Sequence, residues 1–100
     1  MERDNHIMLF DFYGSLLTER QNHVFTLYYM EDYSLAEVGH ELGITPQAVL
    51  DMLKRSVKSL EKYESKLGFI QKFAKIEIIL NNESDIDIIK TILKEELYGI

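Results

Sequence analysis

The sequence predicts an all-α fold, a helix-turn-helix bundle with extra helices at its C-terminal end. Apolar residues recur at intervals of three and four along most of the chain, which is the spacing of amphipathic helices. Alternating apolar and polar runs, and the dipeptides typical of β-hairpins, do not stand out. Residues 34–58 are central to this prediction because they fit a short helix, a glycine turn and a longer helix with a basic outer face.

The composition is that of one globular domain, or of a small domain with an appendage. The 100 residues are 46% hydrophobic and 28% charged, which suits one modest core. Cysteine does not occur, which excludes disulfides, thiolate zinc sites and a cysteine nucleophile. The N-terminal residues lack the features of a signal peptide, and no apolar run has membrane-spanning length. We therefore expect a cytoplasmic protein with no membrane contact.

Positive charge is concentrated in one short part of the chain. Residues 1–53 carry two basic and nine acidic groups, a net charge of −7. Residues 54–75 have a net charge of +5, from seven basic and two acidic groups, and residues 76–100 have a net charge of −4. The overall charge of −6 argues against a general nucleic-acid binder, but the basic window suggests a local contact with a polyanion.

Two helices are predicted ahead of the helix-turn-helix. The first runs from about residue 5 to residue 13, and Gly14 follows as a stop. The second begins after Thr18, because Thr18 and Gln21 have the spacing of a capping box. Met8, Leu9 and Phe12 lie at helical spacing in the first helix, and Val24, Leu27 and Tyr28 form the inner stripe of the second.

The helix-turn-helix is predicted from residues that meet specific steric needs. Ser34 and Glu37 form a second capping box, which opens its first helix. Gly39 is a small residue where the two helices must approach closely, and Gly43 supplies a left-handed turn four residues later. Val49 follows six residues further on and is expected to anchor the second helix in the core. The alternative is an antiparallel helix pair with a glycine corner and no ligand.

The second helix of the motif is predicted to begin at the cap Thr45. Pro46 occupies its first position, where the missing amide hydrogen costs nothing. Helical spacing continues to about Lys66. We therefore expect a helix-turn-helix domain over residues 1–66, with the motif itself at residues 34–58.

Residues 67–100 are predicted to form a C-terminal helical extension. Gly68 breaks or bends the chain, one helix reaches about residue 80, a turn covers residues 81–83, and Ser84 caps a last helix.

The apolar stripes of these helices exceed what one small core covers, so we expect residues 67–97 to join two copies in a homodimer. The alternative is that they fold back on the first two helices. The stripes comprise Phe69, Phe73, Ile76, Leu80, Ile86, Ile88, Ile89, Ile92, Leu93 and Leu97.

The second helix of the motif also carries the candidate nucleic-acid contacts. First-turn residues of such a helix reach base edges, and here the candidates are Thr45 and Gln47, whose amide suits adenine. Leu50 and Asp51 make the rest of this turn a weak base reader. Phosphate contacts supply affinity without sequence information. The candidates for them are the basic residues further along the face, Lys54, Arg55, Lys58 and Lys62. The alternative is a solvated basic face without a ligand.

Several segments resemble the YlxM family of small helix-turn-helix proteins, over roughly residues 5–80. The second to fourth predicted helices, with the opening Leu17-Thr18-Glu19-Arg20-Gln21, also resemble region 4 of bacterial sigma factors. The resemblance implies a fold like that region with added C-terminal helices, and a link to the signal recognition particle pathway. The chain departs from the family pattern at residues 45–51, where a basic and an aromatic residue are missing from the groove-facing turn. The matching segments are residues 9–13, 15–19, 27–29, 32–35, 47–49, 54–55 and 72–73.

No other pattern points to catalysis or to a metal. His6, His23 and His40 lie on three predicted helices without the pairing that a zinc site needs. Glycine-rich phosphate loops and nucleophile motifs do not occur. We therefore expect no enzyme activity, no metal and no cofactor. Six aromatic residues are interpreted as core packing rather than as a base-stacking platform, namely Phe10, Phe12, Phe25, Tyr28, Tyr29 and Tyr33.

Two functional hypotheses follow. The first is a nucleic-acid-binding protein, acting mainly through backbone phosphates as a regulator or accessory of the signal recognition particle pathway. The second is a protein-interaction module that uses the helix-turn-helix fold as a scaffold. It would bind a signal recognition particle component without contacting nucleic acid.

Overall fold

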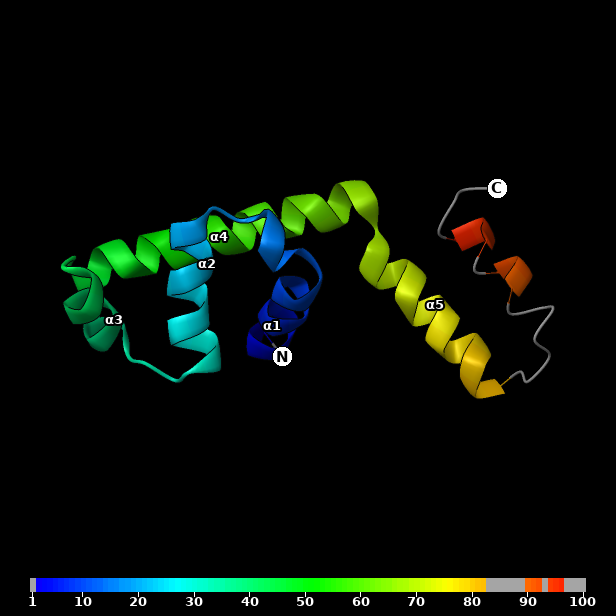
Figure 1. Ribbon diagram of the computed structural model, residues 1–100, viewed down its shortest axis with the longest axis horizontal. Coiled ribbons are helices and arrows are strands. Elements are labelled where there is room, and N and C mark those ends of the chain that lie inside the picture. The colour runs from blue at the N-terminus through cyan, green and yellow to red at the C-terminus, as the bar shows by residue number, and fades with distance from the viewer. Residues whose placement is uncertain (1, 83–89, 93, 97–100) are drawn as a thin grey trace. The chain divides into compact units, whose positions relative to one another are not determined.

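The computed structural model describes residues 2–82, 90–92 and 94–96, and those residues form helices and short turns without a strand (Figure 1). The all-α prediction is confirmed. The chain divides into two compact units, Met1–Lys66 and Leu67–Ile100, and each is described by itself.

The first unit is organised around one long helix. In Figure 1, α1, α2 and α3 lie along one side of α4. The elements are α1 (Glu2–Tyr13), a 3₁₀ turn η1 (Gly14–Leu16), α2 (Glu19–Phe25), a π-helical turn η2 (Thr26–Met30), α3 (Leu35–Leu42) and α4 (Pro46–Leu67). The helix-turn-helix is formed by α3 and α4.

The core of the first unit lies where the shorter helices meet α4. Its polar member, Ser56, is satisfied because its hydroxyl donates to the Met52 carbonyl at 2.8 Å. The Tyr13 hydroxyl donates to the Glu64 carboxylate, which ties the end of α1 to α4. The residues with no more than 1% exposure include Tyr13, Val24, Phe25, Val38, Val49, Ser56 and Leu60.

Both predicted capping boxes are present. The Gln21 amide donates to the Thr18 hydroxyl, and the Thr18 amide donates to the Gln21 side chain, each at 3.1 Å. The Ser34 and Glu37 pair repeats this arrangement at 2.9 and 3.0 Å. Side chains therefore satisfy amides that the first turn of a helix leaves without intrahelical partners.

Two helix boundaries and two short turns differ from the sequence-based expectation. Helix α1 begins at Glu2 rather than at residue 5. The turns η1 and η2 were not expected, because 3₁₀ and π segments leave no regular spacing in a sequence. Helix α5 (Phe69–Asn82) continues through Asn81, where a turn was predicted. Asparagine lowers helix propensity by less than about 1 kcal/mol, too little to end a helix.

The second unit begins beside Gly68, whose φ of +63° separates α4 from α5. Ile76 is its most buried described residue, at 6% exposure. Lys75 Nζ lies 3.7 Å from Glu96 Oε1, which connects α5 to the helical residues 94–96. Several predicted features lie outside the described residues, namely the end of the turn at Glu83, the cap at Ser84, and Ile86, Ile88, Ile89, Leu93 and Leu97.

Candidate nucleic-acid interface

The turn of the helix-turn-helix closes tightly against α3. A Cβ atom on Gly39 would lie 2.6 Å from the Ile44 carbonyl oxygen, so only glycine fits without a shift. Gly43 ends α3 with a φ of +70°, and its amide donates to the Gly39 carbonyl. Both glycines therefore act as the spacing predicted, with the closest approach to the turn backbone at Ile44 and a second one, at 3.4 Å, to the nitrogen of Pro46 at the start of α4.

Burial on one side of α4 fixes which residues face solvent. Val49, Leu53 and Leu60 are at most 4% exposed and lie on the inner face. All four predicted phosphate contacts are exposed on other faces. Across the described part of the chain, none of them forms an ion pair with a carboxylate. These residues, Lys54, Arg55, Lys58 and Lys62, thus present their charges to solvent.

Lysines follow α4 at a regular interval of four residues. Lys54, Lys58, Lys62 and Lys66 are all exposed, and we call this set the lysine row. Successive members are separated by about 6 Å along the helix axis, from a rise of about 1.5 Å per residue. The row turns slowly around the helix, because four residues exceed one helical turn. Sequence-based reasoning had not included Lys66 among the contacts.

The two residues predicted to read bases already have partners within α4. The Thr45 hydroxyl accepts a hydrogen bond from the Ala48 amide at 3.1 Å, as the helix cap. The Gln47 amide nitrogen donates to Asp51 Oδ1 at 3.4 Å. Thr45 and Gln47 are both exposed, but a base would have to compete with the hydrogen bonds that their side chains already make to Ala48 and Asp51. Their role in a groove stays a prediction, and their geometry favours weak base reading.

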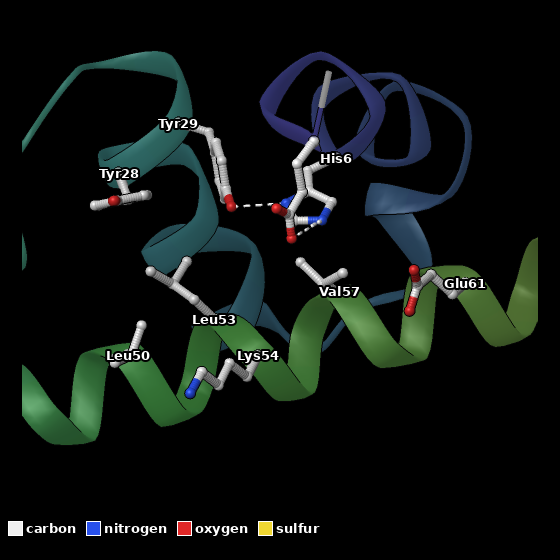
Figure 2. Close-up of a pocket in the computed structure, with 9 residues that line it drawn as sticks. His6, Tyr28, Tyr29, Leu50, Leu53, Lys54, Val57 and Glu61 are labelled. Carbon is white, nitrogen blue, oxygen red and sulfur yellow. Dashed lines mark hydrogen bonds and ion pairs between the residues drawn. The ribbon is translucent and has the colours of Figure 1, made fainter.

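A hollow lies beside the lysine row. Figure 2 shows it between α4 on one side and α1 and η2 on the other. Its volume is about 320 Å³. Leu53 and Val57 point from α4 towards His6 and Tyr29 (Figure 2). The remaining lining residues are Glu2, Tyr28, Leu50, Lys54 and Glu61, so Lys54 belongs both to the lysine row and to the hollow.

Tyr29 is held firmly in the wall of this hollow. Its ring packs against Phe25, with centroids 4.4 Å apart and the ring planes tilted by 30°, and the Arg3 guanidinium lies 5.5 Å from its centroid. Its hydroxyl shares a 2.8 Å hydrogen bond with His6 Nδ1. Burial raises the pKa of Tyr29, and the nearby Tyr28 and Glu2 raise it further. The phenol therefore stays protonated at neutral pH.

The sequence pattern did not reveal the hollow. Tyr28 and Tyr29 were both interpreted as core residues, but the structure leaves each half-buried at the hollow. The π-helical turn η2 carries both of them, and such turns recur at functional sites. Adjacent residues on a regular helix point about 100° apart, so ordinary periodicity gave no signal for a shared site.

Neither a metal-binding cluster nor a membrane-spanning helix occurs among the described residues. Within them, no group of three or more His, Asp or Glu side chains could hold a metal ion. The described helices also include none long and apolar enough to cross a membrane.

Comparisons with known proteins identify the family. The family model described as "Putative helix-turn-helix protein, YlxM / p13 like" (UPF0122) matches residues 1–98. A UPF0122 protein of Thermoanaerobacter sp. (strain X514) is 43% identical over 96 residues, covering 85% of this chain and 82% of the relative. One of Halalkalibacterium halodurans is 44% identical over 93 residues, covering 92% of this chain and 84% of the relative. A Listeria innocua relative is 46% identical over 77 residues, covering 76% of this chain and 70% of the relative. The chain therefore belongs to the UPF0122 family of YlxM/p13-like helix-turn-helix proteins, as the resemblance in its sequence indicated.

Proposed function

We propose that this protein binds nucleic acid through backbone phosphates. The observation that carries the proposal is the lysine row on α4, which is exposed and without ion pairs to carboxylates in the described residues. Arg55 lies beside the row and adds a further exposed cation. A row of cations 6 Å apart, from the helix rise of about 1.5 Å per residue, suits the repeating charges of a single phosphate backbone.

The surrounding charge restricts where a polyanion can bind. Residues 1–53 have a net charge of −7, so they repel phosphates. Thr45 and Gln47 could add contacts in a groove, but their bonds within α4 weaken base selection. The proposed binding is therefore strongly salt-dependent and only weakly dependent on base sequence.

The link to the signal recognition particle pathway makes the RNA of that particle the first target to test. That link comes from the resemblance to the YlxM family and not from the geometry of the site. We propose an accessory or regulatory role in that pathway, in which the helix-turn-helix holds an RNA or DNA backbone. The role requires no catalytic step and no cofactor.

A salt titration tests this function. The affinity for signal recognition particle RNA and for duplex DNA would be measured by fluorescence anisotropy at several salt concentrations. The logarithm of the affinity should fall linearly with the logarithm of the salt concentration.

Lys58→Glu should weaken binding to all sequences alike and reduce the slope by roughly 1. Arg20→Glu changes the charge equally at an exposed site on α2 and should retain tighter binding than Lys58→Glu. Salt-independent binding, or none, would refute the function.

The second candidate is the protein-interaction module. It is favoured by three large apolar residues exposed on the acidic first unit, Met8 at 46%, Leu16 at 51% and Met30 at 44%. A purified component of the signal recognition particle can be tested for binding with and without nuclease. Binding that survives nuclease, together with no affinity for either nucleic acid, would favour this module.

We also propose that the second unit joins two copies of the chain. The apolar positions of α5 that support this are Phe69, Phe73 and Leu80, which are 40%, 50% and 51% exposed, whereas Ile76 is already buried within the second unit. Dimerisation would place two lysine rows in one particle, which raises affinity for a long polyanion without a new kind of contact.

A further inference from the structure

We propose that the hollow beside Lys54 binds one unstacked nucleobase of a single strand whose phosphates follow the lysine row. The inference rests on the proposed function and names its ligand more closely, as a single-stranded segment or loop. It also assigns roles to Tyr28 and Tyr29, which the sequence alone had placed in the core.

The walls of the hollow suit a flat ring. The rings of Tyr28 and Tyr29 are 5.0 Å apart between centroids and nearly perpendicular, at 88°. Aliphatic side chains from α4 line the opposite side, where Figure 2 shows Leu50, Leu53 and Val57. A volume of about 320 Å³ is sufficient for one base. Base stacking on an aromatic residue contributes about 1–3 kcal/mol and tolerates any base.

The wall formed by Tyr29 is already in place before a ligand arrives. Phe25 packs against the Tyr29 ring, and His6 shares a hydrogen bond with its hydroxyl. The Tyr29 carbonyl accepts a further bond from Arg3 at 2.8 Å. A base would therefore enter a preorganised site, which lowers the entropy lost on binding.

The polar groups around the hollow favour different positions for the base and for its phosphates. Glu2 and Glu61 are exposed carboxylates, which repel a phosphate but accept hydrogen bonds from an exocyclic amino group. Lys54 attracts the phosphate to the outer side of α4. This arrangement favours cytosine, adenine and guanine, which carry amino groups, over uracil.

Continuity with the lysine row selects a single strand rather than a duplex. Lys54 lines the hollow, and Lys58, Lys62 and Lys66 lead away from it in successive steps of four residues. A strand that follows the row can insert a base at its Lys54 end. In a duplex the bases are paired and stacked, so a base could enter the hollow only after it is unpaired, which costs free energy.

The test uses the full chain and three RNA decamers with equal numbers of phosphates, made of cytidine, of uridine or of abasic ribose. Affinities would be measured by fluorescence anisotropy at one fixed salt concentration. We expect the cytidine decamer to bind about tenfold more tightly than the abasic decamer, within the range for stacking of one base. The uridine decamer should fall between them.

Variants locate the effect in this hollow. Tyr28→Leu should remove most of the preference for cytidine over abasic ribose, whereas Tyr28→Phe, which keeps the ring, should retain it. Tyr33→Leu is the matched control, since Tyr33 is also half-buried but lines a different hollow with Ala36 and His40. Circular dichroism would verify that each variant is folded.

The outcomes distinguish the inference from the function on which it rests. Equal affinity for the cytidine and abasic decamers would overturn the base site and leave the phosphate row intact. Equal effects of Tyr28→Leu and Tyr33→Leu would also overturn it. If none of the decamers binds, both the inference and the proposed function fail.

Discussion

Two glycines of the helix-turn-helix, four residues apart, are required for different physical reasons. Gly39 is required by space, because a Cβ atom there would lie 2.6 Å from the Ile44 carbonyl oxygen. Gly43 is required by conformation, because it has a φ of +70°, although a Cβ atom there would have no neighbour within 4 Å. The sequence spacing identified both glycines. The structure shows that a steric contact restricts Gly39, whereas the backbone conformation alone restricts Gly43.

Substitutions at the two glycines should therefore have unequal effects. Gly39→Ala should lower the free energy of unfolding by about 1–3 kcal/mol, because the turn backbone must move away. Gly43→Asn should cost less than Gly39→Ala, because asparagine tolerates the left-handed conformation. Urea denaturation followed by circular dichroism measures both. Equal losses, or a larger loss for Gly43→Asn, would contradict the steric explanation for Gly39.

At the scale of the element, α3 depends on its capping box. The Ser34 amide donates to the Glu37 carboxylate, and the Glu37 amide donates to the Ser34 hydroxyl. The bond from the Ser34 amide, and after it the interaction of the Ser34 hydroxyl with the same carboxylate, lower the pKa of Glu37 below its ordinary value. Since the folded pKa is depressed, the charged carboxylate stabilises the fold above the unfolded pKa of about 4.3. That contribution is lost as the pH falls through the folded pKa.

Acid titration of stability should therefore reveal the capping box. Glu37→Gln keeps an acceptor for the Ser34 amide but cannot be protonated, so its melting temperature should fall less than that of the wild type between pH 6 and pH 3. Glu41→Gln removes one charge from the same helix outside the capping box and serves as the control. Melting curves by circular dichroism provide the measurement. A fall with acid as steep in Glu37→Gln as in Glu41→Gln would be evidence against this role.

Elements with local signals were predictable from the sequence, and the others were not. The ends of α2, α3 and α4 follow from Thr18, Ser34, Gly43 and Pro46, whose side chains or ring act within one turn of the chain. The π-helical turn η2 has no such local signal. Its packing against α3 is a tertiary property, and so is the half-burial of its two tyrosines.

At the scale of the whole molecule, the same division separates the lysine row from the hollow. The row lies on a single helix, so helical periodicity and charge were enough to predict most of it. The hollow gathers Glu2 and His6 from α1, two tyrosines from η2, and five residues from α4. Long-range packing brings these elements together. A pattern within any one of them could therefore not predict the site.

The proposed dimer is the remaining property that belongs to the whole molecule. We expect sedimentation equilibrium of the full chain to show a concentration-dependent rise towards twice the monomer mass of 11.7 kDa. Leu80→Glu should shift this equilibrium towards monomer, because a charge in an apolar interface is costly. Leu16→Glu is the matched control, since Leu16 and Leu80 are each 51% exposed but Leu16 lies in the first unit. A monomer at every concentration, or equal effects of the two variants, would reject an interface formed by α5.

Loss of dimer should also weaken binding of a long RNA more than of a decamer, because only the long strand can engage two lysine rows.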